Sequence, residues 1–198
     1  RHALLLSAAY GMLPVEERPL AHRLAADHLI ARGERDAALV AHHLLRANEH
    51  YAESGEILAG LIKESPKPNW RLLYARGIAY ERSGRWPEAQ ADLEAALKLA
   101  PDEPELLNYL GYSWVERGEN LAEARRMLER AVALRPQDGN IADSLGWALF
   151  KLNDIPGAIR WLERAVELES RSSVINDHLG DAYWAAGRQR EAQFQWRR

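Results

Sequence analysis

The hydrophobic and polar positions of this chain repeat at a fixed interval. From Trp70 to Trp196, apolar residues recur with the three- and four-residue spacing of amphipathic helices, separated by short polar, glycine or proline segments. Four glycines mark the same place in this pattern, and subtracting neighbouring positions gives intervals of 34, 35 and 34 residues. A period in this range is typical of a stacked helical solenoid. The four are Gly77, Gly111, Gly146 and Gly180.

Each repeat predicts two helices, the first carrying the glycine and the second an alanine followed by a large apolar residue. Antiparallel helices approach closely only where one presents little bulk, so we expect glycine and alanine to mark the crossing. A mid-helix glycine costs about 0.5–1 kcal/mol relative to alanine, so four at one register indicate a packing role. The alanine and large-residue pairs are Ala89/Leu93, Ala124/Leu128, Ala158/Leu162 and Ala192/Trp196.

The repeats are irregular over residues 1–68 and regular from residue 69. Projecting the pattern backwards puts His42 in the glycine position, Ser54 in the alanine position and Leu58 in the large position. The regular repeats span 69–102, 103–137, 138–171 and an incomplete 172–198. We expect helices near 2–12, 16–32, 35–48, 51–64, 69–83, 86–100, 104–117, 120–134, 139–153, 155–169, 172–186 and 188–198, with Gly84, Gly118 and Gly187 at turns.

The segments around the glycines resemble the tetratricopeptide repeat. Its W-x2-L-G-x2-Y, A-x3-F and P signature matches roughly two thirds of the chain. The matching segments run over 73–80, 107–114, 142–149 and 176–183, and Pro101 and Pro136 close two of the units. The resemblance implies an all-α fold, a right-handed superhelical solenoid of about six antiparallel helix pairs.

The resemblance also implies where a partner binds. In the family the first helix of each pair lines the concave face, at positions three before, one after and four after the glycine. These offsets form one stripe on a helix face. The stripe comprises Tyr74, Ile78, Glu81, Asn108, Tyr112, Val115, Asp143, Trp147, Phe150, Asp177, Asp181 and Trp184. The candidate partner-binding residues are Tyr74, Ile78, Asn108, Tyr112, Asp143, Trp147, Asp177 and Asp181.

Two interpretations of this stripe remain open. Aromatic side chains beside carboxylates suit an extended or helical peptide with apolar anchors and some positive charge. Alternatively, Tyr112 and Trp147 pack between repeats, an interpretation favoured further for Phe150 and Trp184. Asp143 and Asp177 have a second alternative, which is capping or hydrogen bonding near the helix starts. Asn108 resembles the asparagine of family members that grip a terminal carboxylate, but no groove lysine accompanies it, so that ligand class is disfavoured.

No residue pattern indicates an enzyme, a metal site or a cofactor. The spacings of His22, His28, His42, His43 and His50 do not place two imidazoles on one helix face. Asp177, His178 and Asp181 form the tightest polar cluster, but no nucleophile accompanies them. The sequence lacks a phosphate-cradling glycine loop and a nucleophile elbow.

Composition narrows the partner class. The chain has 198 residues, 47% hydrophobic, with a net charge of -3, so no strong basic field favours nucleic acid or an anionic membrane surface. It has no cysteine for a disulfide, thiolate site or thiol nucleophile, and no apolar run as long as a membrane span. We expect a protein or peptide partner. Arg1 at the start, and a last helix with little chain to cover it, suggest a piece of a longer protein.

Three runs carry a closer resemblance, to bacterial repeat proteins of the cell envelope. They are 107–114, 143–147 and 175–184. More distantly, they are similar to outer-membrane repeat lipoproteins that act as adaptors for a carboxy-terminal processing protease. The resemblance implies a Gram-negative source, periplasmic placement and an adaptor role. The sequence thus predicts a scaffold or adaptor; alternatives are the recognition arm of an enzyme whose catalytic domain lies elsewhere and a module that self-associates through helices such as 188–198.

Overall fold

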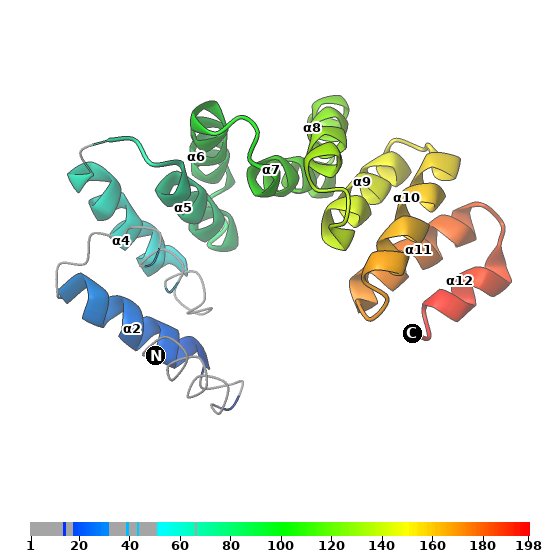
Figure 1. The fold of residues 1–198 in the computed structure, drawn as a ribbon, viewed down its shortest axis with the longest axis horizontal. Helices are drawn as coiled ribbons and strands as arrows, with labels where there is room; N and C mark the ends of the chain where they lie inside the picture. Colours follow the sequence, from blue (N-terminus) through cyan, green and yellow to red (C-terminus); the bar gives the residue numbers. More distant parts are fainter. Residues whose placement is uncertain (1–13, 15–17, 32–38, 40–42, 44–50, 66) are drawn as a thin grey trace. The chain divides into compact units, whose positions relative to one another are not determined.

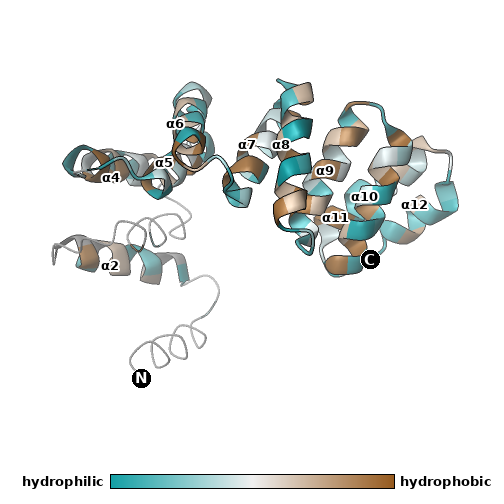
Figure 2. Ribbon diagram, turned by 45° about the horizontal axis from the view of Figure 1, so that its top comes forward, coloured by the Kyte–Doolittle hydropathy of each residue, from teal (hydrophilic) through white to brown (hydrophobic). Residues whose placement is uncertain are grey.

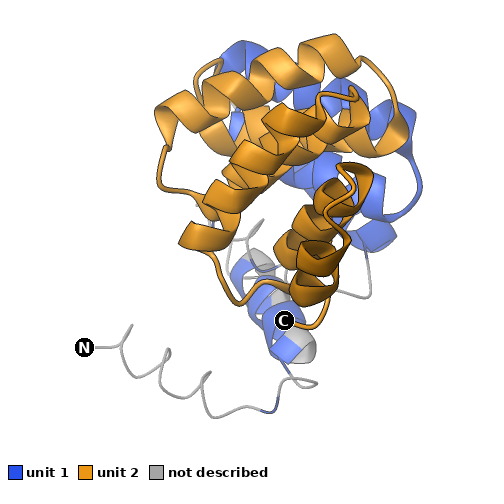
Figure 3. Ribbon diagram, turned by 90° about the vertical axis from the view of Figure 1, so that its right-hand side faces the viewer, with its two compact units in different colours: residues 1–99 blue, residues 100–198 orange. Residues whose placement is uncertain are grey.

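The computed structural model describes residues 14, 18–31, 39, 43, 51–65 and 67–198. Their regular secondary structure is helical, as the repeat pattern predicted, and the chain divides into two units, 1–99 and 100–198 (Figure 3). The helices in order are α2 (Arg18–Ala31), α4 (Tyr51–Glu64), α5 (Trp70–Arg82), α6 (Trp86–Leu99), α7 (Pro104–Arg117), α8 (Leu121–Leu134), α9 (Gly139–Lys151), α10 (Ile155–Leu168), α11 (Ser173–Ala185) and α12 (Gln189–Gln195) (Figure 1). The helix expected at 2–12, most of that at 35–48, and His42 lie outside the described residues.

The four glycines lie where the first helix of each pair meets the second, which confirms the crossing predicted from the sequence. A Cβ atom at Gly77 would stand 2.9 Å from Leu93 Cγ, and one at Gly146 would stand 2.6 Å from Leu162 Cγ. Real Cβ atoms do not approach other atoms so closely, so these contacts require glycine. Gly180 meets Trp196 in the same way, and a Cβ atom at Gly111 would make a tight contact of 3.0 Å with Leu128 Cγ.

The turns within pairs also follow the sequence. Gly84, Gly118 and Gly187 adopt φ values of 82°, 69° and 77°, the left-handed region that suits glycine. The sequence did not predict that Asn153 occupies the equivalent turn position between α9 and α10, with φ of 63°. Asparagine is one of the few other residues that tolerate this conformation. The extra residue of the second interval is absorbed in the turn after Gly118, where Asn120 is also left-handed, with φ of 47°.

In unit 1, α2, α4, α5 and α6 share buried apolar contacts. Leu58 of α4 is fully buried in a cluster with Ala26, Leu72 and Ala79, which confirms its predicted place in a large-residue position. Asp92 of α6 is buried and accepts two hydrogen bonds from the Arg76 guanidinium, at 2.6 and 2.7 Å. Arg76 stands where the other repeats carry leucine beside the glycine, so this ion pair replaces an apolar contact.

In unit 2, three pairs follow one another: α7 with α8, α9 with α10, and α11 with α12. Each second helix contacts the first helix of the next pair, and α9 also contacts α7 and α11. Apolar and polar residues share these helices, as Figure 2 shows in brown and teal. Because α7, α9 and α11 are the first helices of successive pairs, equivalent repeat positions fall at the same place on each of these helices.

Candidate functional site

Six of the eight predicted binding residues lie in unit 2, on three successive first helices. We call the matching positions of these helices the first-helix stripe. It consists of Asn108, Tyr112 and Val115 on α7, Asp143, Trp147 and Phe150 on α9, and Asp177, Asp181 and Trp184 on α11. The other two predicted residues, Tyr74 and Ile78, lie on α5 of unit 1, both partly buried.

Trp147 packs between repeats. Its side chain is 8% exposed and stacks on His178, with ring centroids 4.1 Å apart, and on Phe150 at 4.9 Å. The indole Nε1 donates a hydrogen bond to Glu116 Oε1 at 2.7 Å. The packing interpretation therefore holds for Trp147, whereas Phe150 is partly buried and stacks on Trp147 of its own helix. The Trp147 side chain has no polar atom left to offer a ligand.

Asp143 links two repeats through a histidine. His178 Nδ1 lies 2.9 and 3.0 Å from the two carboxylate oxygens of Asp143, which is 6% exposed. Within the sequence cluster of Asp177, His178 and Asp181, the structure pairs His178 with Asp143 of α9, the first helix of the preceding repeat. Asp138 and Ser172 cap α9 and α11, so capping by Asp143 and Asp177 is wrong, while the hydrogen-bonding alternative holds for Asp143 through His178.

Tyr112 and Asn108 leave polar atoms on the stripe. Burial, with the nearby carboxylates of Glu116 and Asp143, raises the pKa of Tyr112 to about 12. The phenol therefore stays protonated at neutral pH. Asn108 Oδ1 is buried and has no hydrogen-bond donor within the part of the chain that the structure describes.

The end of the stripe on α11 is open. Asp177 is exposed and Asp181 partly exposed, and neither makes an ion pair or side-chain hydrogen bond with any described residue. Trp184 is 48% exposed, so the packing expected for it is wrong. Val115, at the matching position of α7, is fully buried. The Trp184 ring packs at a tilt against the ring of Trp196, with the ring centroids 5.6 Å apart.

The second helix α8 differs from α11 in its charges. Each of its five charged side chains lies in an ion pair. Arg125 pairs with Glu129 at 2.7 Å, Arg126 with Glu123, and Arg130 with Asp102 before α7. The charges of α8 are thus balanced within the unit.

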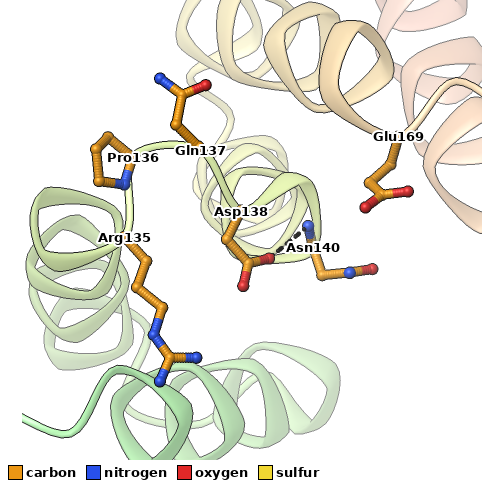
Figure 4. A pocket seen from close by; sticks show the side chains of 6 residues that line it. All are labelled: Arg135, Pro136, Gln137, Asp138, Asn140 and Glu169. Carbon is orange, nitrogen blue, oxygen red and sulfur yellow. Dashed lines mark hydrogen bonds between the residues drawn. The ribbon is translucent and has the colours of Figure 1, made fainter.

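Two shallow pockets lie away from the stripe, at loops that precede first helices. The one in unit 2 has a volume of about 430 Å³ and is lined by Arg135, Pro136, Gln137, Asp138, Asn140 and Glu169 (Figure 4). Asp138 is committed to capping α9, and Arg135 to Glu103 and Glu105. The other, of about 470 Å³ in unit 1, includes Trp70 and Arg71. Their main polar groups serve the fold, so we do not assign them a small-molecule ligand.

Neither a metal site nor a membrane span is found in the described ranges. They hold no group of three or more side chains of metal-ligand type placed around one point. His22 and His43 do approach, with Nδ1 atoms 2.8 Å apart, a contact between helices that the sequence spacing could not predict. No helix among the described residues is both long and apolar enough to cross a bilayer.

Comparison with known proteins identifies the repeat. The family model described as "Tetratricopeptide repeat" matches residues 41–102, 74–120 and 116–173. Among solved structures, "MamA 41-end from Desulfovibrio magneticus RS-1" is 20% identical over 90% of each chain, with a TM-score of 0.67. MamA of AMB-1 is 23% identical over 74% of this chain and 86% of its own, at 0.64. A chain of the "APC/C hetero-tetramer Cut9-Hcn1" is 18% identical over 91% of this chain and 36% of its own, at 0.77. At these identities the likeness shows the fold.

Proposed function

Because the chain belongs to the tetratricopeptide repeat family, we propose that it is a non-enzymatic scaffold that binds a partner protein or peptide on its first-helix stripe. One observation carries the proposal. The stripe holds the carboxylates of Asp177 and Asp181, which lack partners among the described residues, and an exposed tryptophan, whereas the charges of α8 are paired. Polar and aromatic groups without partners are what a binding surface keeps available.

The packed residues of the stripe have a supporting part in this proposal. Trp147, His178 and Asp143 hold α9 against α11 through a ring stack and a hydrogen bond. A surface fixed in this way before the partner arrives loses little conformational entropy on binding. Asn108, Tyr112, Asp177 and Asp181 would then contact the partner directly, with Trp184 as an apolar anchor.

Site-specific photocrosslinking tests which face is used. A photoreactive phenylalanine replaces Trp184 on the stripe or, as the control, Phe194 on the second helix α12; both are exposed aromatic residues. In cells of the source organism, the full-length protein with the probe at 184 should form an adduct with another protein. The probe at 194 should not. Adducts at 194 alone would contradict the proposal.

A second candidate function, self-association, is favoured by the exposed aromatic residues on the last helix pair. Phe194 is 62% exposed and Trp196 41% exposed. In the same experiment, an adduct of two copies through position 194 would support this function over the scaffold. Sedimentation of the full-length protein at several concentrations provides an independent check, since self-association predicts a mass that rises with concentration.

The resemblance of residues 107–114, 143–147 and 175–184 supports a finer proposal, an adaptor in the bacterial cell envelope that brings a partner to a processing protease or an assembly machine. Cell fractionation tests the placement. Recovery with the envelope fraction is the expected result, and recovery with the cytoplasmic fraction alone would contradict it. Reading the full-length gene tests the other class, a recognition arm, because that class requires a catalytic domain in the same chain.

A further inference from the structure

We propose that a pocket of unit 1 binds an acidic segment of a partner protein, in which carboxylates flank an apolar side chain. The pocket, which we call the α5 pocket, has a volume of about 470 Å³ and is lined by residues just before α5, by the first residues of α5 and by Leu99 of α6. It lies away from the first-helix stripe, so the inference goes beyond the scaffold function and does not depend on it.

The first argument is positive charge that the fold does not use. Lys67 and Arg71 line the pocket, both are exposed, and neither makes an ion pair with any described residue. Other polar groups of the pocket do serve the fold. Asn69 Oδ1 accepts a hydrogen bond from the backbone N–H of Arg71 at 2.9 Å, and Ser65 Oγ donates to the Lys67 carbonyl at 2.8 Å. No carboxylate is among the described residues that line the pocket, so a partner would have to supply the anion.

The second argument is that these cations are peculiar to one repeat. Counted from the glycine of each first helix, the positions of Lys67 and Arg71 hold Pro101 and Glu105, then Pro136 and Asn140, then Ser170 and Val174. The helix dipole disfavours a cation in the first turn of a helix, and α5 has no acidic residue there to offset Arg71. The packing of the repeat therefore does not explain these two residues.

The third argument is the aromatic and apolar surface beside the charge. The Arg71 guanidinium lies over the ring of Trp70, with its Cζ atom 4.5 Å from the ring centroid. A guanidinium held against an aromatic face keeps N–H groups available for a carboxylate, which it can bind through two hydrogen bonds. Leu99 of α6 is 46% exposed and offers contact to an apolar side chain. An anion alone would leave this apolar surface unused.

The corresponding pocket of unit 2 lacks this chemistry, although it occupies the same place in its repeat. Two carboxylates line it, those of Asp138 and Glu169. Its basic side chain, that of Arg135, pairs with Glu103 and Glu105. We therefore expect an acidic segment to bind the α5 pocket and not its counterpart.

Titration of the full-length protein by nuclear magnetic resonance tests the proposal. The probes are three decapeptides of glycine and serine with a central leucine, flanked on each side by two glutamates, two glutamines or two lysines. The glutamate peptide should shift the indole N–H signal of Trp70 and the amide signals of Arg71 and Leu99, while the amide of Asn140 in the unit 2 pocket stays unchanged.

The affinities test the chemistry of the segment. At the Trp70 signal, we expect the glutamate peptide to bind about tenfold more tightly than the glutamine peptide, and the difference to shrink at high salt. Serine in place of the central leucine should weaken binding of the glutamate peptide about threefold, because the apolar contact with Leu99 is lost.

Two double variants locate the preference. Lys67→Gln with Arg71→Gln should abolish the difference between the glutamate and glutamine peptides. Arg190→Gln with Arg197→Gln removes the same charge from α12 and the segment after it, where both side chains are also exposed and without an ion pair among the described residues, and should leave the difference intact. Circular dichroism confirms that both variants are folded.

Three results would overturn the inference. They are equal binding or no binding of the glutamate and glutamine peptides at the Trp70 signal, a preference that survives Lys67→Gln with Arg71→Gln, and an oligothymidylate of equal charge that binds there as tightly as the glutamate peptide. The last result would show a surface that responds to charge alone. Each of them leaves the scaffold function standing, because photocrosslinking at Trp184 tests that function separately.

Discussion

Helices α8 and α11 belong to the same unit and the same repeat family, yet they use charge in opposite ways. Each charged side chain of α8 lies in an ion pair, either along the helix or with Asp102. On α11, Asp177 and Asp181 lack such partners among the described residues, and the contact that His178 makes with Asp143 reaches across to another repeat. The comparison teaches that the repeat fixes the packing of both helices while leaving two carboxylates of the first helix without partners among the described residues.

The two helices differ because of what lies beside them. Side chains on α8 find opposite charges three or four residues away on the same helix. The stripe positions Asp143 and Trp147 of α9 instead meet His178, one repeat away. The stripe is therefore built of contacts between repeats where it is packed, and of unpartnered groups where it is open.

Trp147→Ala has the largest expected effect on this comparison. The change removes a buried ring, its stacking contacts with His178 and Phe150, and its hydrogen bond to Glu116. We therefore expect the free energy of unfolding of unit 2 to fall by about 3–5 kcal/mol. The control, Trp184→Ala, removes a half-exposed ring from the same stripe and should cost about 1 kcal/mol or less. Native-state hydrogen exchange resolves unit 2 and measures both. Equal costs would contradict the division into packed and open parts.

Gly146→Ala sharpens the packing side of the comparison. The new Cβ would stand 2.6 Å from Leu162 Cγ, so we expect a loss of about 1–3 kcal/mol through overpacking. A Cβ atom placed on Gly60 of α4 would have no other atom within 4 Å. Gly60→Ala should therefore stabilise its helix by about 0.5–1 kcal/mol. Hydrogen exchange of α9 measures the expected loss of stability in Gly146→Ala, and hydrogen exchange of α4 measures the expected gain in Gly60→Ala. A gain at both positions would show that the glycine column is not a close contact.

The smallest expected effect is a loss of stability at alkaline pH through Tyr112. Burial raises the pKa of Tyr112 to about 12, against 10.0 in the unfolded chain. The neutral phenol is therefore favoured by folding, and its contribution is complete below pH 10 and declines as the pH rises through about 12. Urea unfolding midpoints over this range should fall less steeply in Tyr112→Phe than in the wild type. Identical slopes would place the Tyr112 hydroxyl in water.

Much of the fold could be predicted from the sequence because it depends on residue size at fixed intervals. The glycine positions, the alanine and leucine partners and the turn glycines are all visible as a repeat. Asn153 was not predicted, because asparagine takes the left-handed conformation less often than glycine. The buried pair of Arg76 and Asp92 was also missed, since a charged residue in an apolar column is recognised only when its partner is seen.

The candidate site could be predicted as a face, while the state of each side chain on it could not. The period assigns Trp147 and Trp184 to the same stripe, yet one is 8% exposed and the other 48%. Trp147 has the following first helix beside it, with His178 stacked on its ring, whereas the ring of Trp184 packs against Trp196 of its own repeat. Similarly, the neighbours of His178 along the sequence are Asp177 and Asp181, but its partner is a whole repeat away. The binding role of the eight predicted residues stays a prediction.

The central claim is that α11 presents unbalanced negative charge while α8 does not, and proton relaxation by charged paramagnetic cosolutes measures this without a ligand. A cationic and an anionic nitroxide of the same size are compared at the backbone protons of both helices. The account predicts that the cationic probe relaxes protons around Asp177 and Asp181 more strongly than the anionic probe, with nearly equal effects along α8. Equal effects on both helices, or an excess of the anionic probe at α11, would contradict it.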